Sequence, residues 1–350
     1  MNRLDAFRQQ VQGAALIDNR VNMRYLTGYT GEGSLLVLAG KACILTDSRY
    51  TEQAGIQAPF CEVIKTTADL KRDAIVKQLM DEAGETSLFV EVEILTVKAF
   101  RALQEALTGI ELKDLPDVCS TLRAIKTQDE LDMIAKGAQI SCDSFMEFLN
   151  VLHAGMTEKE ARTELEYIML KHGSEGPAFH TIVASGMNGS LPHAVPSDKV
   201  IENGDLVTFD FGASYGGYAS DMTRTVAVGT ISSELKAIYD AVYTAHMNAL
   251  AAVKPGAVCK DIDGIARTYL DARYPGAFGH SLGHGVGLEV HEQPGVRSKG
   301  ETVLVPGHVI TIEPGVYLPG VGGCRIEDTV FVTEDGYFDP YTAPKTLLTI

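Results

Sequence analysis

The amino-acid sequence predicts two domains, an α/β domain over residues 1–123 and an α+β domain over residues 124–350. Before residue 123, short β-like runs alternate with helix-like stretches, which is typical of an α/β domain. After it, helices and antiparallel strand pairs occur in separate runs, which is typical of an α+β domain. None of the nine histidines precedes His153, so histidine-dependent chemistry must lie in the second domain.

The elements of the first domain are short. We expect strands at residues 14–17, 34–38, 42–46 and 88–90, and helices at residues 69–82 and 97–107. A charged, weakly apolar stretch at residues 121–126 precedes the next strong helix signal. The domain boundary is therefore expected near residue 123.

Capping boxes mark the first helices of the second domain. Thr127 and Glu130 have the spacing in which each side chain can cap the other residue's backbone, and Thr157 and Glu160 repeat it. The first helix should run to about residue 152, and the second to residue 172, with Gly173 as its C-cap. Further helices are expected at residues 233–253 and 259–272, and strands at residues 206–211, 218–228, 309–316 and 325–332.

The composition limits the partners and the location of the protein. Its 45% hydrophobic and 22% charged residues are typical of a globular protein. The net charge of −16 argues against nucleic acid and anionic membranes, because phosphate groups bind positive surfaces. We expect a cytoplasmic protein, since the N-terminal residues lack an apolar signal core and no apolar run has membrane-spanning length. The six cysteines form no CxxC pair, which predicts reduced thiols.

Five residues of metal-binding type stand in the second domain: Asp210, Asp221, His284, Glu313 and Glu327. Both pairs of acids lie in apolar segments with strand character, where an unpaired ionised carboxylate is costly to bury. Alternate residues of a strand share a face. Two hairpins built from the expected strands can therefore direct four carboxylates inward, while His284 approaches from a glycine-rich loop. This arrangement predicts a site for two cations.

The types of these side chains indicate the metal. Oxygen-rich ligation with one imidazole favours Mn²⁺, with Co²⁺, Fe²⁺ or Zn²⁺ as alternatives, over a structural zinc site of Cys and His. Two metal ions that share carboxylates suit hydrolysis by a bridging hydroxide, because they lower the pKa of bound water. The alternative is that each acid pairs with an arginine such as Arg224 or Arg325.

Two motifs surround these residues, GYASDMTRT at residues 217–225 and GHGVGLEVHE at residues 283–292. Shorter motifs lie at residues 181–186, 191–193, 210–212, 313–315 and 325–328, and at residues 47–50 and 123–126. With these motifs in this order, the chain resembles the pita-bread metallopeptidases, specifically the two-domain branch of Xaa-Pro aminopeptidases and Xaa-Pro dipeptidases (prolidases). The resemblance implies a pita-bread catalytic domain over residues 124–350, preceded by a creatinase-type α/β domain over residues 1–123.

The resemblance also implies how the metal ions are held. Asp210 would chelate one ion, His284 and Glu313 would complete the other, and Asp221 and Glu327 would bridge both. Glu313 would in addition carry a proton from the attacking water to the leaving nitrogen. A proline amide needs such an acid because its nitrogen is a poor leaving group until it is protonated.

Other matching positions lie near the substrate in this family. His193, His280 and His291 would hydrogen-bond the substrate or the developing oxyanion. Arg325 would lie close to the site, and Thr223 would hold a metal-binding side chain in position without binding the metal itself. The first domain holds no ligand; by resemblance it forms a homodimer and narrows access, which limits substrates to short peptides.

The expected activity is release of the N-terminal residue from short peptides, preferentially before proline, with Xaa-Pro dipeptidase activity as the alternative. Gly295 stands where dipeptidase-like relatives often carry an arginine that grips the free carboxylate of a dipeptide. Arg297 lies two residues further on and could replace that arginine. His180 and Cys324 also depart from the family pattern, which often has an acid and usually a valine at these positions.

Two more distant alternatives belong to other functional classes. The run GHSLG at residues 279–283 fits the nucleophile elbow of a serine esterase, with Ser281 as the nucleophile. However, no strand pattern precedes it, and a glycine-rich loop follows. The other alternative is a non-catalytic peptide-binding module, which would be free to lose its metal ligands, yet all five are present.

Overall fold

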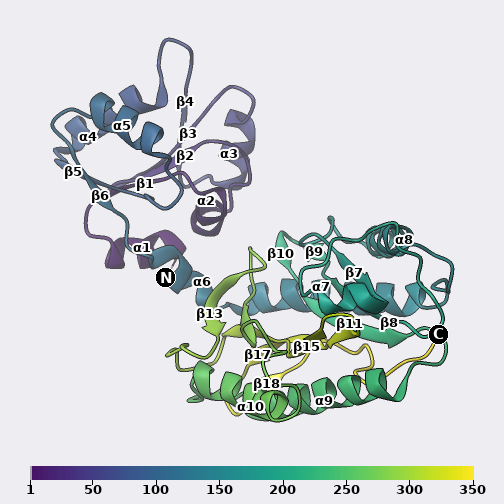
Figure 1. Ribbon diagram of the computed structural model, residues 1–350. Coiled ribbons are helices and arrows are strands. Elements are labelled where there is room, and N and C mark those ends of the chain that lie inside the picture. Colours follow the sequence, from purple (N-terminus) through teal and green to yellow (C-terminus); the bar gives the residue numbers. More distant parts are fainter. Residues whose placement is uncertain (1) are drawn as a thin grey trace. The chain divides into compact units, whose positions relative to one another are not determined.

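The computed structural model describes residues 2–350, which form two compact units. One unit ends at Leu122, and the other spans Arg123–Ile350. The first unit combines a mixed sheet with helices, and the second combines an antiparallel sheet with two pairs of longer helices (Figure 1). The predicted fold classes, α/β followed by α+β, are therefore confirmed.

A six-stranded sheet with the order β4-β3-β2-β1-β5-β6 forms the centre of the first unit. In chain order its elements are α1 (Arg3–Gln10), β1 (Ala14–Ile17), α2 (Arg20–Thr27), β2 (Ser34–Val37), β3 (Ala42–Thr46), α3 (Thr51–Gln57), β4 (Glu62–Lys65), α4 (Arg72–Ala83), β5 (Ser87–Val90), α5 (Val97–Ala106), β6 (Glu111–Asp114) and α6 (Val118–Ala124). The apolar strands β1, β2, β3 and β5 match the predicted segments. The sequence does not predict the edge strands β4 and β6, because at least half of the residues in each are charged and the strands are only partly buried.

The second unit is built on a larger antiparallel sheet with the order β13-β12-β14-β17-β11-β8-β7, to which β18 adds beside β17. Its elements are α7 (Gln128–Phe148), α8 (Glu158–Lys171), β7 (Ile182–Ser185), the 3-10 helix η1 (Gly186–Ser190), β8 (Leu206–Phe211), β9 (Ser214–Tyr215), β10 (Tyr218–Ala219), β11 (Met222–Ala227), α9 (Ser233–Leu250), α10 (Cys259–Asp271), β12 (Gly283–Gly285), β13 (Glu292–Val296), β14 (Val309–Ile312), β15 (Gly315–Leu318), β16 (Gly322–Arg325), β17 (Glu327–Val332) and β18 (Tyr337–Phe338).

Two helix pairs cover different parts of this sheet (Figure 1). Helices α7 and α8 pack with β7, β8 and β11 around Phe145, Phe148 and Phe209. Helices α9 and α10 pack with β14, β16 and β17 in a second apolar cluster. Both predicted capping boxes, at the starts of α7 and α8, are present. Each helix pair thus packs against a different group of strands and holds those strands in place.

The strands that carry acids are interrupted, whereas the sequence pattern predicts continuous strands. The expected strand 309–316 ends at Ile312 and resumes at Gly315, because Pro314 has no N–H to donate. The expected strand 325–332 is also split, at Ile326, and β15 pairs with β16 in a separate two-stranded sheet. Strands β14 and β17 pair antiparallel as predicted, but not as a simple hairpin.

The described residues also bear on disulfides and on membrane insertion. All six cysteines are buried and unbridged. Each helix within residues 2–350 is too short or too polar to cross a lipid bilayer.

Candidate functional site

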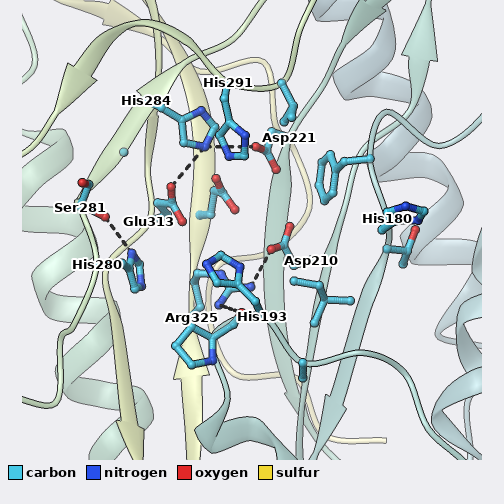
Figure 2. A pocket seen from close by; sticks show the side chains of 18 of the residues that line it. His180, His193, Asp210, Asp221, His280, Ser281, His284, His291, Glu313 and Arg325 are labelled. Carbon is cyan, nitrogen blue, oxygen red and sulfur yellow. Dashed lines mark hydrogen bonds and ion pairs between the residues drawn. The ribbon is translucent and has the colours of Figure 1, made fainter. Parts of the chain in front are cut away.

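A pocket of about 850 Å³ in the second unit collects the residues singled out in the sequence (Figure 2). This volume lies in the range of typical small-ligand sites. Its lining includes Asp210, Asp221, His284, Glu313, Glu327, His193, His280, His291 and Arg325. The fold thus brings together residues that are up to 134 positions apart in the sequence.

Strand pairing places two of the acids on either side of one threonine. In β11, Thr223 pairs with Asp210 of β8 and with Glu327 of β17. The Thr223 hydroxyl donates a hydrogen bond to Oε2 of Glu327 at 2.5 Å. Asp221 lies just before β11, in the break that follows β10. Cross-strand neighbours are about 5 Å apart, so these three acids face the same space.

The remaining two candidate ligands come from β12 and the end of β14. The His284 N–H donates to the Thr311 hydroxyl at 3.0 Å, and the Glu313 N–H donates to the Leu282 carbonyl at 2.8 Å. These bonds aim the His284 Nε2 atom at two carboxylates, 3.3 Å from Oε1 of Glu313 and 3.6 Å from Oδ2 of Asp221 (Figure 2).

The donor atoms suit a divalent metal ion. Ligand atoms of Asp221, His284 and Glu327 all lie within 4.8 Å of one another. The Nδ1 atom of His284 is 3.0 Å from the Gly285 carbonyl, to which it can donate, and this leaves the Nε2 lone pair for a metal. The buried Oδ1 atoms of Asp210 and Asp221 have no hydrogen-bond partner among the described residues. Carboxylate oxygens with one imidazole nitrogen are suitable ligands for divalent metal ions.

Arginine pairing explains only one of the acids. Arg325 donates from Nη2 to Oδ2 of Asp210 at 2.6 Å. The other candidate arginine, Arg224, pairs with Asp328 at 2.7 Å and pairs with none of the pocket carboxylates. Within residues 2–350, neither Asp221 nor Glu327 has an arginine or lysine partner.

Burial and mutual repulsion change how the pocket groups ionise. Burial, and then the charge of Asp210, raises the pKa of Asp221 well above its ordinary value. Burial, and then the charge of Asp221, does the same to the pKa of Glu327. Burial alone would lower the pKa of His284, but its hydrogen bond to Glu313 and the acid charges outweigh this and raise the pKa to about 9. Such a concentration of negative charge is typical of a cation site.

Tyr317 links the substrate-side residues and was missed in the sequence. Its hydroxyl lies 2.8 Å from Nε2 of His280 and accepts a hydrogen bond from Nη1 of Arg325 at 2.8 Å. The His291 ring packs edge-on against His284, with 4.3 Å between centroids. His193 also lines the pocket. No motif signals Tyr317, because its role depends on the β15–β16 pairing.

The structure contradicts the serine-esterase alternative. Ser281 lines the pocket, but irregular backbone precedes it, and the short strand β12 follows where an elbow needs a helix. The neighbouring ring of His280 contacts the backbone carbonyl of Ser281 and Tyr317, so it does not activate the Ser281 hydroxyl.

Comparisons with known proteins agree with this geometry. The model of metallopeptidase family M24 matches residues 132–334, and that of the Creatinase/Prolidase N-terminal domain matches residues 3–125. An Xaa-Pro dipeptidase of Pyrococcus horikoshii is 39% identical over 92% of this chain and 91% of its own.

Solved structures are similar over nearly the whole chain. An Xaa-Pro dipeptidase from Bacillus anthracis has a TM-score of 0.96 and 39% identity, and covers 99% of both chains. An X-Pro aminopeptidase from Thermotoga maritima has a TM-score of 0.91 and 36% identity, and covers 98% of this chain and 99% of its own. The second unit has the pita-bread fold of these enzymes. The chain belongs to metallopeptidase family M24 and carries a creatinase/prolidase-type N-terminal domain.

Proposed function

We propose that this metallopeptidase is an Xaa-Pro dipeptidase, which hydrolyses the bond before the proline of a dipeptide. The observation that carries the proposal is Arg297 at the pocket, where it can bind the free carboxylate of the substrate. The dipeptidases of Pyrococcus horikoshii and Bacillus anthracis support this alternative better than the aminopeptidase activity that the sequence favours. The chain is also similar to the X-Pro aminopeptidase from Thermotoga maritima, so aminopeptidase activity is the competing function that the experiment must distinguish.

Arg297 takes the space beside the position where dipeptidase-like relatives often carry their arginine. A Cβ atom on Gly295 would stand 3.5 Å from Nε of Arg297, so the arginine side chain folds over this glycine. Arg297 lines the pocket and has no ion-pair partner among residues 2–350. A guanidinium can bind a carboxylate through two parallel hydrogen bonds, which suits the terminus of a dipeptide.

The acids and His284 would hold two divalent metal ions, for which we propose Mn²⁺. Asp221 and Glu327 would bridge the two ions, Asp210 would bind one, and His284 and Glu313 would bind the other. When bound, the ions supply Lewis-acid polarisation of the scissile carbonyl and lower the pKa of water. The unpartnered Oδ1 atoms of Asp210 and Asp221 support this assignment.

Glu313 is suited to move the proton. In the metal-free protein, burial would raise the pKa of Glu313, but its hydrogen bond to His284 and the charge of that ring outweigh burial and lower the pKa. Glu313 can accept a proton from the attacking water and pass it to the proline nitrogen, which cannot leave as an anion. The Thr311 hydroxyl, 3.3 Å from Oε1, helps to orient it.

The histidines and Arg325 would position the substrate. Burial lowers the pKa of both His280 and His291, which keeps these rings uncharged at neutral pH. His193 and His291 can then hydrogen-bond the substrate or the developing oxyanion. His280 already contacts Ser281 and Tyr317, so we propose that it acts mainly by orienting Tyr317 and, through it, Arg325.

We further propose, from the family resemblance, that the chain forms a homodimer whose N-terminal domains narrow access to the site. Light scattering should then give twice the chain mass of 37.7 kDa.

Replacing Arg297 separates the two activities. The wild-type enzyme should hydrolyse an Ala-Pro dipeptide far better than Ala-Pro amide or an Ala-Pro-Ala tripeptide. In Arg297→Ala, KM for Ala-Pro should rise about 10- to 100-fold, because a hydrogen-bonded charge contact contributes about 1.5–3 kcal/mol. The same substitution should leave the kinetics of the amide almost unchanged, as steady-state assays would reveal.

Lys299→Ala is the matched control, since Lys299 is an exposed cation two residues away that does not line the pocket. It should behave like the wild type with all three substrates. Equal turnover of dipeptide and tripeptide by the wild type, with no selective effect of Arg297→Ala, would contradict the dipeptidase proposal and favour an aminopeptidase.

A further inference from the structure

Glu158, outside the metal site, has an unusually complete set of hydrogen bonds. Its Oε1 atom accepts from the Ser185 N–H at 2.8 Å, the Ser185 hydroxyl at 2.9 Å and the Asn188 side-chain amide at 3.1 Å. Its Oε2 atom accepts from the Ser197 hydroxyl at 2.7 Å, the Ser197 N–H at 3.0 Å and the Asn188 amide at 3.2 Å. One carboxylate thus ties together residues from both ends of a loop.

The surroundings of Glu158 show that neutral donors alone hold this charge. The residue is fully buried, at 0% exposure, in the first turn of α8. Among residues 2–350, no lysine, arginine or histidine pairs with it. The helix N-terminus favours an anion here, but burial of a carboxylate without a cation is tolerated only when its oxygens are fully hydrogen-bonded.

In the loop that Glu158 closes, residues 186–197, the three large apolar side chains are exposed, whereas the smaller Ala194 and Pro196 are buried. Met187, Leu191 and Val195 are 64%, 55% and 81% exposed. Burial of these three side chains therefore contributes little to holding the loop in place. The polar contacts of Glu158 with Ser185, on one side, and Ser197, on the other, fix its two ends.

The loop forms one wall of the substrate pocket. Pro192, His193 and Val195 line the pocket, and Figure 2 shows His193 beside Asp210 and Arg325. The Pro192 carbonyl accepts a hydrogen bond from Nη1 of Arg325 at 3.2 Å, while Nη2 of the same arginine holds Asp210. A displacement of the loop would therefore reach both the substrate-side histidine and a metal-binding acid.

The loop also packs closely on the strand that carries Arg325. A Cβ atom on Gly189, in η1, would stand 3.1 Å from the Gly323 nitrogen in β16, and one on Gly323 would collide with the Gly189 carbonyl. Such close backbone packing depends on a fixed position of η1.

We propose that Glu158 is a positioning residue of this peptidase: its buried carboxylate clamps both ends of loop 186–197 and thereby holds His193 and the Pro192 carbonyl in place at the substrate pocket. Glu158 does not touch substrate or metal; it acts through the loop. The kinetic readout of this inference rests on the proposed dipeptidase function, whereas the structural readout does not.

Glu158→Gln is the direct test in the metal-loaded, full-length enzyme. The glutamine amide cannot accept from the donors that face one carboxylate oxygen, so two or more buried donors lose their partner. Amide hydrogen exchange within residues 186–197 should accelerate at least about tenfold, while exchange in the core strands β8 and β11 stays unchanged. KM for Ala-Pro should rise about tenfold, and the metal content should stay that of the wild type.

Glu160→Gln is the matched control, because Glu160 lies in the same helical turn but is exposed and bonds only the Thr157 cap. Its glutamine can keep that cap, so exchange and KM should be those of the wild type. If Glu158→Gln does not fold, Ser197→Ala should give the same local effect in a milder form. Ser197→Thr should restore it, since the hydroxyl returns.

Unchanged exchange of residues 186–197 in folded Glu158→Gln and Ser197→Ala would overturn the inference. Faster exchange throughout the unit, with metal loss, would also overturn it and leave Glu158 a general stabilising residue. Failure of the wild type to cleave Ala-Pro would instead reject the proposed function, while the exchange experiment would still decide the role of Glu158.

Discussion

Two of the pocket acids do not help to stabilise the fold by themselves. Asp221 and Glu327 are 3% and 1% exposed, lie close together and have no arginine or lysine partner within residues 2–350; His284, 3.6 Å from Asp221, offers a positive charge. Burial raises both pKa values, so ionising both acids opposes folding unless a cation is added. Residues that cost stability in this way are typical of functional sites.

A different buried group, His308, predicts how stability responds to acid. Its Nδ1 atom accepts a hydrogen bond from the Val305 N–H at 3.2 Å, and burial with the nearby charge of Lys126 lowers its pKa to about 4. Because the folded pKa lies below the ordinary value of about 6.5, His308 stabilises the fold fully above pH 6.5 or so. That contribution, up to about 3 kcal/mol, should be lost as the pH falls towards 4.

Urea unfolding of the metal-free protein at several pH values would measure this loss. His308→Gln keeps an acceptor but cannot be protonated, so its free energy of unfolding should fall less between pH 6.5 and 4 than that of the wild type. His153→Gln, at an exposed histidine, should follow the wild type. A constant difference between His308→Gln and the wild type at all pH values would rule out the titration of His308 as the cause.

At the scale of elements, a buried ion pair joins β17, which carries Glu327, to β11, which begins just after Asp221. Arg224 of β11 pairs with Asp328 of β17 at 2.7 Å and also donates to the backbone carbonyls of Glu327 and Ala343. Asp328 further contacts His246 of α9 at 2.9 Å. This network fixes the pairing of β11 with β17 and, with it, the position of Glu327.

Asp328→Asn should therefore destabilise the protein strongly. The substitution leaves the Arg224 guanidinium buried without its counter-charge, which costs about 3–5 kcal/mol in comparable sites. Denaturant unfolding should show a lower midpoint at nearly constant slope. Asp335→Asn, at an exposed aspartate, should change stability by less than about 0.5 kcal/mol. If Asp328→Asn also lowered the free energy of unfolding by less than about 0.5 kcal/mol, the network would contribute little to the β11–β17 pairing.

For the whole molecule, metal binding and folding stability should be coupled. A ligand that binds only the folded chain at about 100 times its Kd adds about 2.7 kcal/mol. Removing metal with a chelator should thus lower Tm by about 5–10 °C for a domain of this size, and Mn²⁺ should restore it. Scanning calorimetry with and without chelator would measure the shift.

His284→Ala is the companion variant, since it removes the single imidazole from the donor set. Its Tm should respond much less to Mn²⁺, and its peptidase activity should be lost while the fold is kept. A wild-type Tm that ignores both chelator and Mn²⁺, or an equal Mn²⁺ response in His284→Ala, would contradict the metal assignment.

Much of this protein can be predicted from the order of its residues. Apolar runs such as residues 14–17 and 42–46 predict strands because they can be buried on both faces, and the Thr127 and Thr157 capping boxes predict helix starts from local contacts alone. The candidate metal ligands can be selected in the same way, since four acids in apolar segments together with a histidine match the chemistry of a cation site.

Only the tertiary structure decided how these residues combine. The sequence indicates which residues of one strand lie on the same face as an acid. It does not indicate that Thr223 lies between Asp210 and Glu327, because strand register depends on packing between segments about 100 residues apart. For the same reason, the choice of Arg325 for Asp210 and of Arg224 for Asp328 appears only in the fold. Local sequence chemistry thus determined the elements and the candidate ligands, whereas burial between distant segments determined which residues lie next to each other.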